Sequence, residues 1–381
     1  MQLNELRRTE FPGLASRIYL NSASVGPLPL RSQRELERWS DRRGRPWEIS
    51  DAEQFETMAT ARERSAALIG ASPEEMAVTT NTSFGLSLAA AGLPLERGDV
   101  VLFSAREFPA NAYPWLALKE RGVLAEVAPP TPEGWPDEDY LVERQQDPRV
   151  KVLAVSLAQF SNGYAVDLAR LSAATRVSGT LLVVDAIQGL GAMPVDVGAT
   201  PVDVLSCGGQ KWLMSPWGSG FTYVRSQVQE QLRPAMIGWL AYEGTEDFTR
   251  LTRYGDQLHH DARKYELGTL PYQDIAAMNV SLELVSQIGV PAIQVQIAKC
   301  QAPLLDWATR RNVRVTSPVG PRSSAILCLA PPDAPGMHRK LADAGVTCSL
   351  REGSLRFAPH WFNTVEEVER VVEVLESRVK S

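Results

Sequence analysis

The chain of 381 residues is poor in the residues that build metal centres and disulfide frameworks. It has four cysteines and four histidines; no two cysteines form a Cys-x-x-Cys pair, and no two histidines are four residues apart. These spacings are the usual signs of a zinc site or a disulfide scaffold, and we therefore expect neither. We interpret the cysteines as small, buried hydrophobic residues.

Long hydrophobic runs and blocks of one charge are also missing. The apolar stretches are far shorter than the ~20 residues that cross a bilayer. The 39 basic and 45 acidic residues give a net charge of −6, without a basic cluster. Residues 1–11 carry two arginines but no apolar run behind them, unlike a secretory signal. We expect a protein of the cytoplasm whose principal partner is neither nucleic acid nor membrane.

The main pattern present is an alternation of short β-branched runs with helical stretches. The runs lie at 76–80, 99–105, 122–128, 151–157, 180–186, 203–208 and 219–224. Such alternation is typical of crossover connections and of a sheet covered on both faces. We predict an α/β fold with a seven-stranded, mainly parallel sheet between helices. The helices include those at 53–69, 109–121 and 167–177, the last with an Asp as its N-cap.

The pattern changes beyond about residue 268. Two helices are predicted first, at 273–288 and 291–309. Short strands follow near 313–317, 324–330, 346–350 and 354–358, and a helix from 363 closes the chain. This order favours a smaller α+β domain. We predict a large domain over 20–270 and a small one over 271–381 that residues 1–19 complete.

Three features follow successive strands, at the edge where ligands bind in open α/β sheets. Asp185 closes the strand TLLVVDA, and Gln188 comes shortly after it. Lys211 lies in a glycine-bracketed loop between two strands. Asn81, Thr82 and Ser83 open a helix, where free N–H groups and the helix dipole favour a phosphate.

These are the three protein groups that a pyridoxal phosphate site requires: an amine for the Schiff base, a carboxylate for the pyridine nitrogen and a phosphate cradle. Each alone has an ordinary alternative. Lys211 could be a surface lysine, Asp185 a helix cap, and Thr82 part of a capping sequence. Their joint occurrence in chain order predicts the cofactor site, with Asp185 holding the ring nitrogen protonated and Lys211 carrying a proton.

At these residues the chain resembles the class V aminotransferases of the fold-type I pyridoxal phosphate enzymes. That family includes cysteine desulfurases, kynureninase and isopenicillin N epimerase-like proteins. The resemblance runs from YLNSASVGPLP (19–29) through VVDAIQG and the GGQKW loop to LRFAPHWFNTVEEVERVVE (355–373). It implies that Lys211 is the Schiff-base lysine and Asp185 the pyridinium partner.

The resemblance also implies the remaining contacts of the site. Those to the cofactor are Thr82, Ser83, Phe108, Gln159, Gln188, Ser206, Gln210, Gly268 and Thr269. Thr82 and Ser83 resemble phosphate ligands, and Gln188 a partner of the phenolic oxygen. The Gly-Thr pair resembles a phosphate contact made across a dimer interface, which implies a homodimer with shared sites. For the substrate it implies Asn21 and Arg356, whose planar fork suits an α-carboxylate; the alternative for Arg356 is a surface strand arginine.

Three departures from the family pattern bear on the reaction. Phe108 stands where desulfurases carry a stacked histidine, and phenylalanine can stack but cannot move a proton. Gly208 removes a hydroxyl next to the lysine, for which Ser206 is the candidate replacement, whereas Gln210 can still donate to a phosphate. Cys348, eight residues before Arg356, lies in a predicted buried strand and not on a mobile loop, so we interpret it as core.

The sequence thus predicts a pyridoxal phosphate enzyme that acts on a small α-amino acid through a carbanion at Cα. We favour a transaminase-like reaction. The alternative is an amino-acid epimerase, and the weaker alternatives are a cysteine desulfurase or C–S lyase and a non-catalytic protein that binds the cofactor. Transamination, epimerisation and elimination share the first proton abstraction, so the sequence leaves them open.

Overall fold

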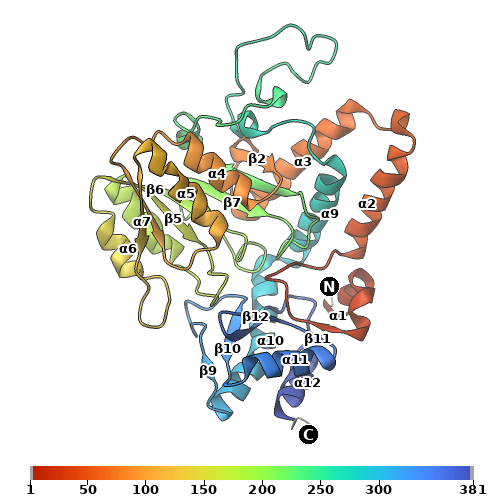
Figure 1. Ribbon diagram of the computed structural model, residues 1–381. Helices are drawn as coiled ribbons and strands as arrows, with labels where there is room; N and C mark the ends of the chain where they lie inside the picture. Colours follow the sequence, from red (N-terminus) through yellow and green to blue (C-terminus); the bar gives the residue numbers. More distant parts are fainter. Residues whose placement is uncertain (1–2, 378–381) are drawn as a thin grey trace.

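The computed structural model describes residues 3–377, and its largest element is a seven-stranded sheet (Figure 1). The strand order is β2 (Met76–Thr79), β8 (Gly220–Val224), β7 (Val204–Gly208), β6 (Leu181–Asp185), β5 (Val150–Ser156), β3 (Val100–Ser104) and β4 (Leu124–Ala128). All neighbours are parallel except those of β8, which runs antiparallel to both β2 and β7. The predicted seven-stranded, mainly parallel sheet between helices is confirmed.

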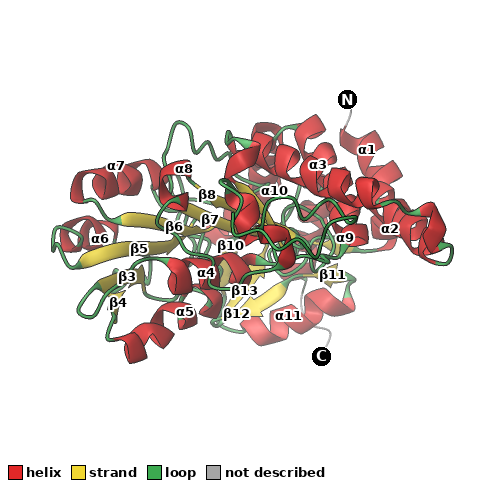
Figure 2. Ribbon diagram, turned by 90° about the horizontal axis from the view of Figure 1, so that it is seen from above, coloured by secondary structure: helices red, strands yellow, loops and turns green. Residues whose placement is uncertain are grey.

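Both faces of the sheet are buried along its inner strands, which explains the apolar runs there, whereas the edge strand β4 is partly exposed. Successive side chains of a strand point to opposite faces. Accordingly, Val183 packs in one hydrophobic core and its neighbour Val184 in the other. The helices form a layer on each side (Figure 2).

The helices of this large part follow the expected alternation. Their bounds are α2 (Leu30–Arg43), α3 (Asp51–Ile69), α4 (Thr82–Gly92), α5 (Tyr113–Leu116), α6 (Glu138–Arg144), α7 (Leu168–Ser178) and α8 (Ser226–Gln229). Asp167 caps α7 as expected, because its side chain accepts the N–H of Arg170. The single helix expected over 109–121 is wrong. The segment is a 3-10 turn, the short α5 and a second 3-10 turn, because Pro114 lacks the N–H that a helix interior needs.

A second, four-stranded antiparallel sheet lies below the first in Figure 1. Its order is β12 (Ser349–Arg351), β13 (Ser354–Phe357), β10 (Leu327–Ala330) and β9 (Arg314–Val315). One face packs with α10 (Val290–Arg310), α11 (Ala334–Asp343) and α12 (Val365–Glu376) around a core of its own. Near the start of the chain, after α1 (Leu3–Glu10), β1 (Ile18–Tyr19) pairs in parallel with β11 (Val346–Thr347). The division into two domains at residue 270 stays a prediction. Residues 1–2 and 378–381 of the predicted small domain lie outside the described part of the chain.

Two consecutive helices connect the two sheets. Helix α9 (Tyr272–Ile288) packs along α2 and α3, and α10 follows it after Gly289, whose φ of 85° breaks the helix. Over residues 3–377, no helix taken alone has both the length and the apolar character to cross a membrane, and α9 with α10, bent by 77°, meets that test only as a pair.

Candidate active site

Asp185 is a nearly isolated carboxylate at the end of β6. Its side chain is buried, and Oδ1 accepts one hydrogen bond, from the N–H of Ile187 at 3.0 Å. Burial raises the pKa of Asp185 to about 6, against the opposing effect of the Lys211 charge. A cationic group that docks beside it would restore its ionised form, which is the property expected of a pyridinium partner.

Lys211 lies just after β7, and β7 is the neighbour of β6, the strand that ends in Asp185. Burial lowers the pKa of its amine to about 8, although the charge of Asp185 acts the other way. The Nζ atom lies 5.6 Å from the centre of the Phe108 ring. An amine with a lowered pKa is partly neutral near pH 8 and can attack an aldehyde. Lys211, Asp185 and Phe108 are therefore brought together, as the sequence predicted.

The start of α4 is bound to β7 by hydroxyl groups. The Thr82 hydroxyl accepts the N–H of Gly208 at 2.8 Å, and the Ser206 hydroxyl donates to the Thr82 carbonyl at 2.9 Å. A Cβ on Gly85 would collide with the Ser206 side chain, so glycine is required for this close approach. Thr82 retains its own proton for a phosphate, and Ser83 is exposed beside it at the helix start.

The two glutamines near the lysine have different surroundings. Gln188 donates to the Ala23 carbonyl at 3.0 Å and accepts from the Trp212 indole at 3.1 Å, so one amide hydrogen is left for a ligand. Gln210 occupies the space that a Cβ on Gly208 would need. The glycine that departs from the family pattern therefore makes room for Gln210.

The sequence analysis missed Glu107, which organises one wall of the site. Its buried carboxylate accepts from the Ser104 hydroxyl at 3.0 Å, the Ser156 N–H at 2.9 Å and the Gln159 amide at 3.2 Å. Burial raises the pKa of Glu107 to about 7, with a smaller contribution from the charge of Asp185. The sequence carries no signal for it, since a glutamate beyond a strand end is usually exposed.

Arg356 lies on β13 and is 2% exposed. Its two terminal nitrogens donate to the Phe160 carbonyl and to the Ser24 hydroxyl, both at 2.8 Å, and burial lowers its pKa to about 10. Asn21 contacts the same group indirectly, because its Oδ1 accepts from Ser24 at 2.9 Å and from Ser349 at 2.6 Å. Arg356 is therefore a buried residue, and the surface alternative is wrong.

Two phenylalanines connect the arginine to the lysine. The rings of Phe108 and Phe160 meet edge to face with centres 5.3 Å apart. Phe160 holds Arg356 through its carbonyl, and Phe108 lies over Lys211. Arg356, Phe160, Phe108 and Lys211 thus lie in one continuous row.

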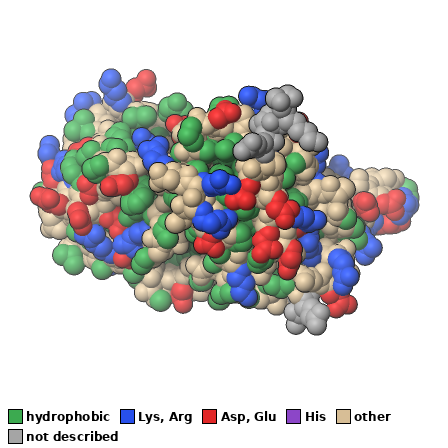
Figure 3. All heavy atoms as spheres, turned by 90° about the horizontal axis from the view of Figure 1, so that it is seen from below, with side chains coloured by type: hydrophobic (Ala, Val, Ile, Leu, Met, Phe, Trp, Pro, Cys, Tyr) green, Lys and Arg blue, Asp and Glu red, His purple; other side chains and the backbone are tan. Residues whose placement is uncertain are grey.

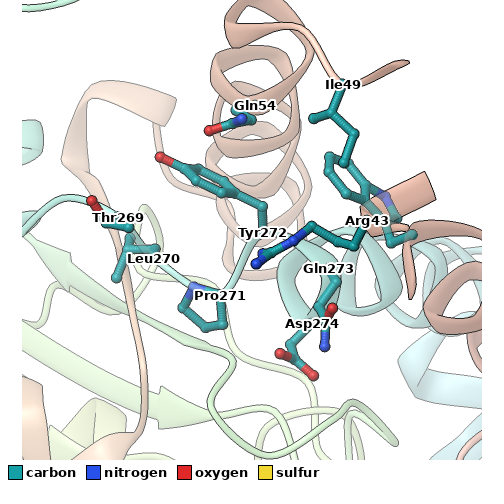
Figure 4. A pocket seen from close by; sticks show the side chains of 10 residues that line it. Arg43, Ile49, Gln54, Thr269, Leu270, Pro271, Tyr272, Gln273 and Asp274 are labelled. Atoms are coloured by element: carbon teal, nitrogen blue, oxygen red, sulfur yellow. The ribbon is translucent and has the colours of Figure 1, made fainter. Parts of the chain in front are cut away.

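Gly268 and Thr269 lie apart from this group. Thr269 lines a pocket of about 460 Å³ between α2, α3 and the start of α9, with Arg43, Gln54 and Tyr272 (Figure 4). Over residues 3–377, no hydrogen bond joins Gly268 or Thr269 to Lys211, Asp185 or Thr82. Their role as a phosphate contact stays a prediction, and within one chain they do not complete the site.

Cys348 lies between β11 and β12 and is 7% exposed. Burial raises the pKa of its thiol to about 12, far from the range of a reactive thiolate. All four cysteines are buried, which confirms their interpretation as core residues.

The residues present fit pyridoxal phosphate. Besides the amine, the carboxylate and the helix start, two buried polar atoms at the site lack a hydrogen-bond partner in the described chain: Gln159 Oε1 and Arg356 Nε. Buried polar atoms are nearly always satisfied, so unpartnered ones in a site indicate groups that a ligand would engage.

The class V aminotransferase family model matches residues 27–330, and the chain belongs to this family of pyridoxal phosphate enzymes. An uncharacterised aminotransferase of Bacillus subtilis, YcbU, is 27% identical over 99% of this chain and 98% of its own. A probable cysteine desulfurase of Methanothermobacter thermautotrophicus is 30% identical over 77% and 72%. The isopenicillin N epimerase of Amycolatopsis lactamdurans is 28% identical over 95% of both chains.

Solved structures show the same fold. A cysteine desulfurase from Thermococcus onnurineus superposes with a TM-score of 0.88 over 99% of this chain and 98% of its own, at 21% identity. A mutant of C-DES with glycine covalently linked to the PLP cofactor gives 0.87 over 97% and 99%, at 18% identity. The fold is that of the fold-type I enzymes, and the cofactor of this family is pyridoxal phosphate.

Proposed function

We propose that this class V enzyme acts on a small α-amino acid by a transaminase-like reaction. The observation that carries the proposal is the row from Arg356 through Phe160 and Phe108 to Lys211, with Asp185 close enough for its charge to act on the Lys211 amine. Bound pyridoxal phosphate supplies an electron sink for the carbanion at the substrate Cα.

Each side chain has a distinct role in the proposed reaction. Arg356 would bind the substrate α-carboxylate, and its Nε is a buried donor without a partner in the described chain. Asp185 keeps the cofactor nitrogen protonated by pairing with it. Lys211 would move the proton at Cα, for which a pKa of about 8 is suited near neutral pH. Phe108 would stack on the cofactor but cannot carry a proton, which leaves this step to Lys211.

The remaining contacts follow from position. We assign the phosphate to Thr82 and Ser83, with Ser206 and Gln210 supporting the cradle. Gln188 and Gln159 would offer the cofactor one free amide hydrogen and one free carbonyl oxygen, respectively. Asn21 positions Ser24 and through it Arg356.

Epimerisation is the second candidate, and the observation that favours it is the similarity to isopenicillin N epimerase over 95% of both chains. Desulfuration is weaker because Cys348 is buried. The hypothesis of a protein that only binds the cofactor is weaker still, since such a protein would not need a buried arginine with an unpartnered donor at the substrate side. Product analysis after incubation with single amino acids distinguishes these reactions.

We also propose that the enzyme is a homodimer in the cytoplasm. The segment 236–258 projects from the body in Figure 1 and exposes six large apolar side chains: Met236, Ile237, Trp239, Phe248, Leu251 and Tyr254. Exposed apolar clusters of this kind mark interfaces. A second copy would cover them and bring Gly268 and Thr269 to the neighbouring phosphate. Sedimentation equilibrium tests the dimer, and a monomer at micromolar concentration would contradict it.

The test of the function is spectroscopic. The purified, cofactor-loaded protein should absorb visible light through the bond to Lys211, and Lys211→Ala should abolish that band with the fold intact by circular dichroism. Lys299→Ala, at an exposed position of α10, is the matched control and should keep the band. A colourless wild type that gains nothing from added cofactor would refute the proposal.

A further inference from the structure

The β12–β13 hairpin presents two arginines on one face. Its register pairs Ser349 with Arg356 and Arg351 with Ser354, across a two-residue turn with positive φ at both positions. Side chains alternate along a strand, so Arg351 lies on the same face as Arg356. Leu355 lies on the opposite face, in the core of the small sheet. The hairpin thus directs both guanidinium groups towards the substrate side of the site.

The spacing of the two arginines suits one small molecule. Residues diagonal to each other in an antiparallel pair have Cα atoms about 7–8 Å apart. Arg356 is fixed by its bonds to Phe160 and Ser24. Arg351 is exposed, and its long side chain can adjust to a group held at Arg356. The charge of Arg351 lowers the pKa of both Arg356 and Lys211, so its field reaches the reacting amine.

Arg351 has no counter-ion of its own. Its one hydrogen bond is to the carbonyl of its neighbour Leu350, at 2.9 Å, and over residues 3–377 it forms no ion pair. Arg356 likewise binds only neutral acceptors. The face in Figure 3 interleaves basic and acidic side chains. Two adjacent uncompensated cations beside the lysine favour a ligand with two negative groups.

We propose that Arg351 binds a second carboxylate of the substrate, so that the preferred substrate is a dicarboxylic α-amino acid with its α-carboxylate at Arg356. This inference rests on the proposed function of the site and specifies its substrate class. Because Arg351 is exposed, water and salt screen its contribution, and we expect a gain in selectivity and not an absolute requirement.

The experiment compares glutamate with glutamine, which has the same length but no second charge. Each is titrated into the cofactor-loaded enzyme, and the change in visible absorbance gives the dissociation constant. We expect the wild type to bind glutamate about tenfold more tightly than glutamine, as one charge-assisted hydrogen bond would give. Arg351→Gln should remove this preference by weakening glutamate binding much more than glutamine binding, and Arg351→Lys should retain part of it. The matched control is Arg314→Gln, at an exposed position of β9 in the same sheet, which should behave as the wild type.

A second measurement needs no reaction. Glutarate, which has two carboxylates and no amine, should raise the midpoint of thermal unfolding of the loaded enzyme more than butyrate does, and Arg351→Gln should abolish the difference. Equal binding of glutamate and glutamine by the wild type, or an unchanged preference in Arg351→Gln, would overturn the assignment of Arg351. A loaded enzyme that distinguishes glutarate from butyrate but responds to no amino acid would instead contradict the proposed function.

Discussion

The two halves of the active site differ in how the chain builds them. The cofactor half comes from the ends of neighbouring strands in one sheet: Asp185 on β6, Lys211 after β7 and the α4 start beside them. The substrate half is assembled from the segment with Asn21 and Ser24, the loop at Phe160 and the β12–β13 hairpin. The first is set by local strand–helix units, and the second by contacts between distant parts of the chain.

The halves also differ in charge. The cofactor half combines a cation with two buried carboxylates, Asp185 and Glu107, whose pKa values are raised by burial. The substrate half has arginines, and within residues 3–377 none of their hydrogen-bond partners is a carboxylate. Capture of the substrate and the bond to the cofactor should therefore be separable by mutation.

The largest separation between substrate binding and cofactor binding is expected on mutation of Arg356. Replacement by Ala should weaken binding of every amino acid by roughly 100-fold, the upper range for hydrogen bonds to a charged group, and leave the visible band intact. Arg356→Lys should recover little, because lysine lacks the bidentate fork. Spectral titration with alanine measures the effect. Loss of the visible band in Arg356→Lys would show that the halves are not independent.

An effect of intermediate size is expected from the titration of Glu107, and it should appear in the dependence of the free energy of unfolding on pH. Its folded pKa of about 7 lies above the usual value of 4.5, so the native state holds more protons than the unfolded chain between these limits. The free energy of unfolding should therefore fall as pH rises from about 5 to 8, by up to roughly 3 kcal/mol.

Glu107→Gln keeps an acceptor oxygen but cannot titrate, so urea unfolding across this range should show a flatter profile. A residual slope of the same sign should remain from Asp185, whose pKa is about 6. An identical slope in both proteins would show that Glu107 titrates normally in the fold.

The smallest effect is expected at Cys348, outside both halves. Cys348→Ala should leave turnover unchanged and cost about 1 kcal/mol of stability through the small cavity it leaves. Steady-state assays with the best substrate measure this. A folded variant that has lost turnover would revive a mechanism in which this thiol carries sulfur.

The comparison of the halves also explains what could be predicted from sequence. The seven strands of the large sheet were predictable from their apolar patterns, which burial on both faces produces in the inner strands but not in the partly exposed edge strand β4. Asp185 ends one of these strands and Lys211 shortly follows another. Glu107, Ser24 and Arg351 were not, because their importance comes from partners brought in by the tertiary fold. The helix expected over 109–121 failed because its apolar spacing concealed the effect of Pro114.

The bond between Arg356 and Ser24 joins residues 332 positions apart in the chain. Closing so long a loop carries a large entropic cost, and contacts of such sequence separation form slowly. During synthesis, every strand of the large sheet emerges before the substrate arginine is made. The order of assembly is thus built into the topology: the lysine pocket can form early, and the proposed substrate pocket is complete only when the last hairpin closes onto the first segment.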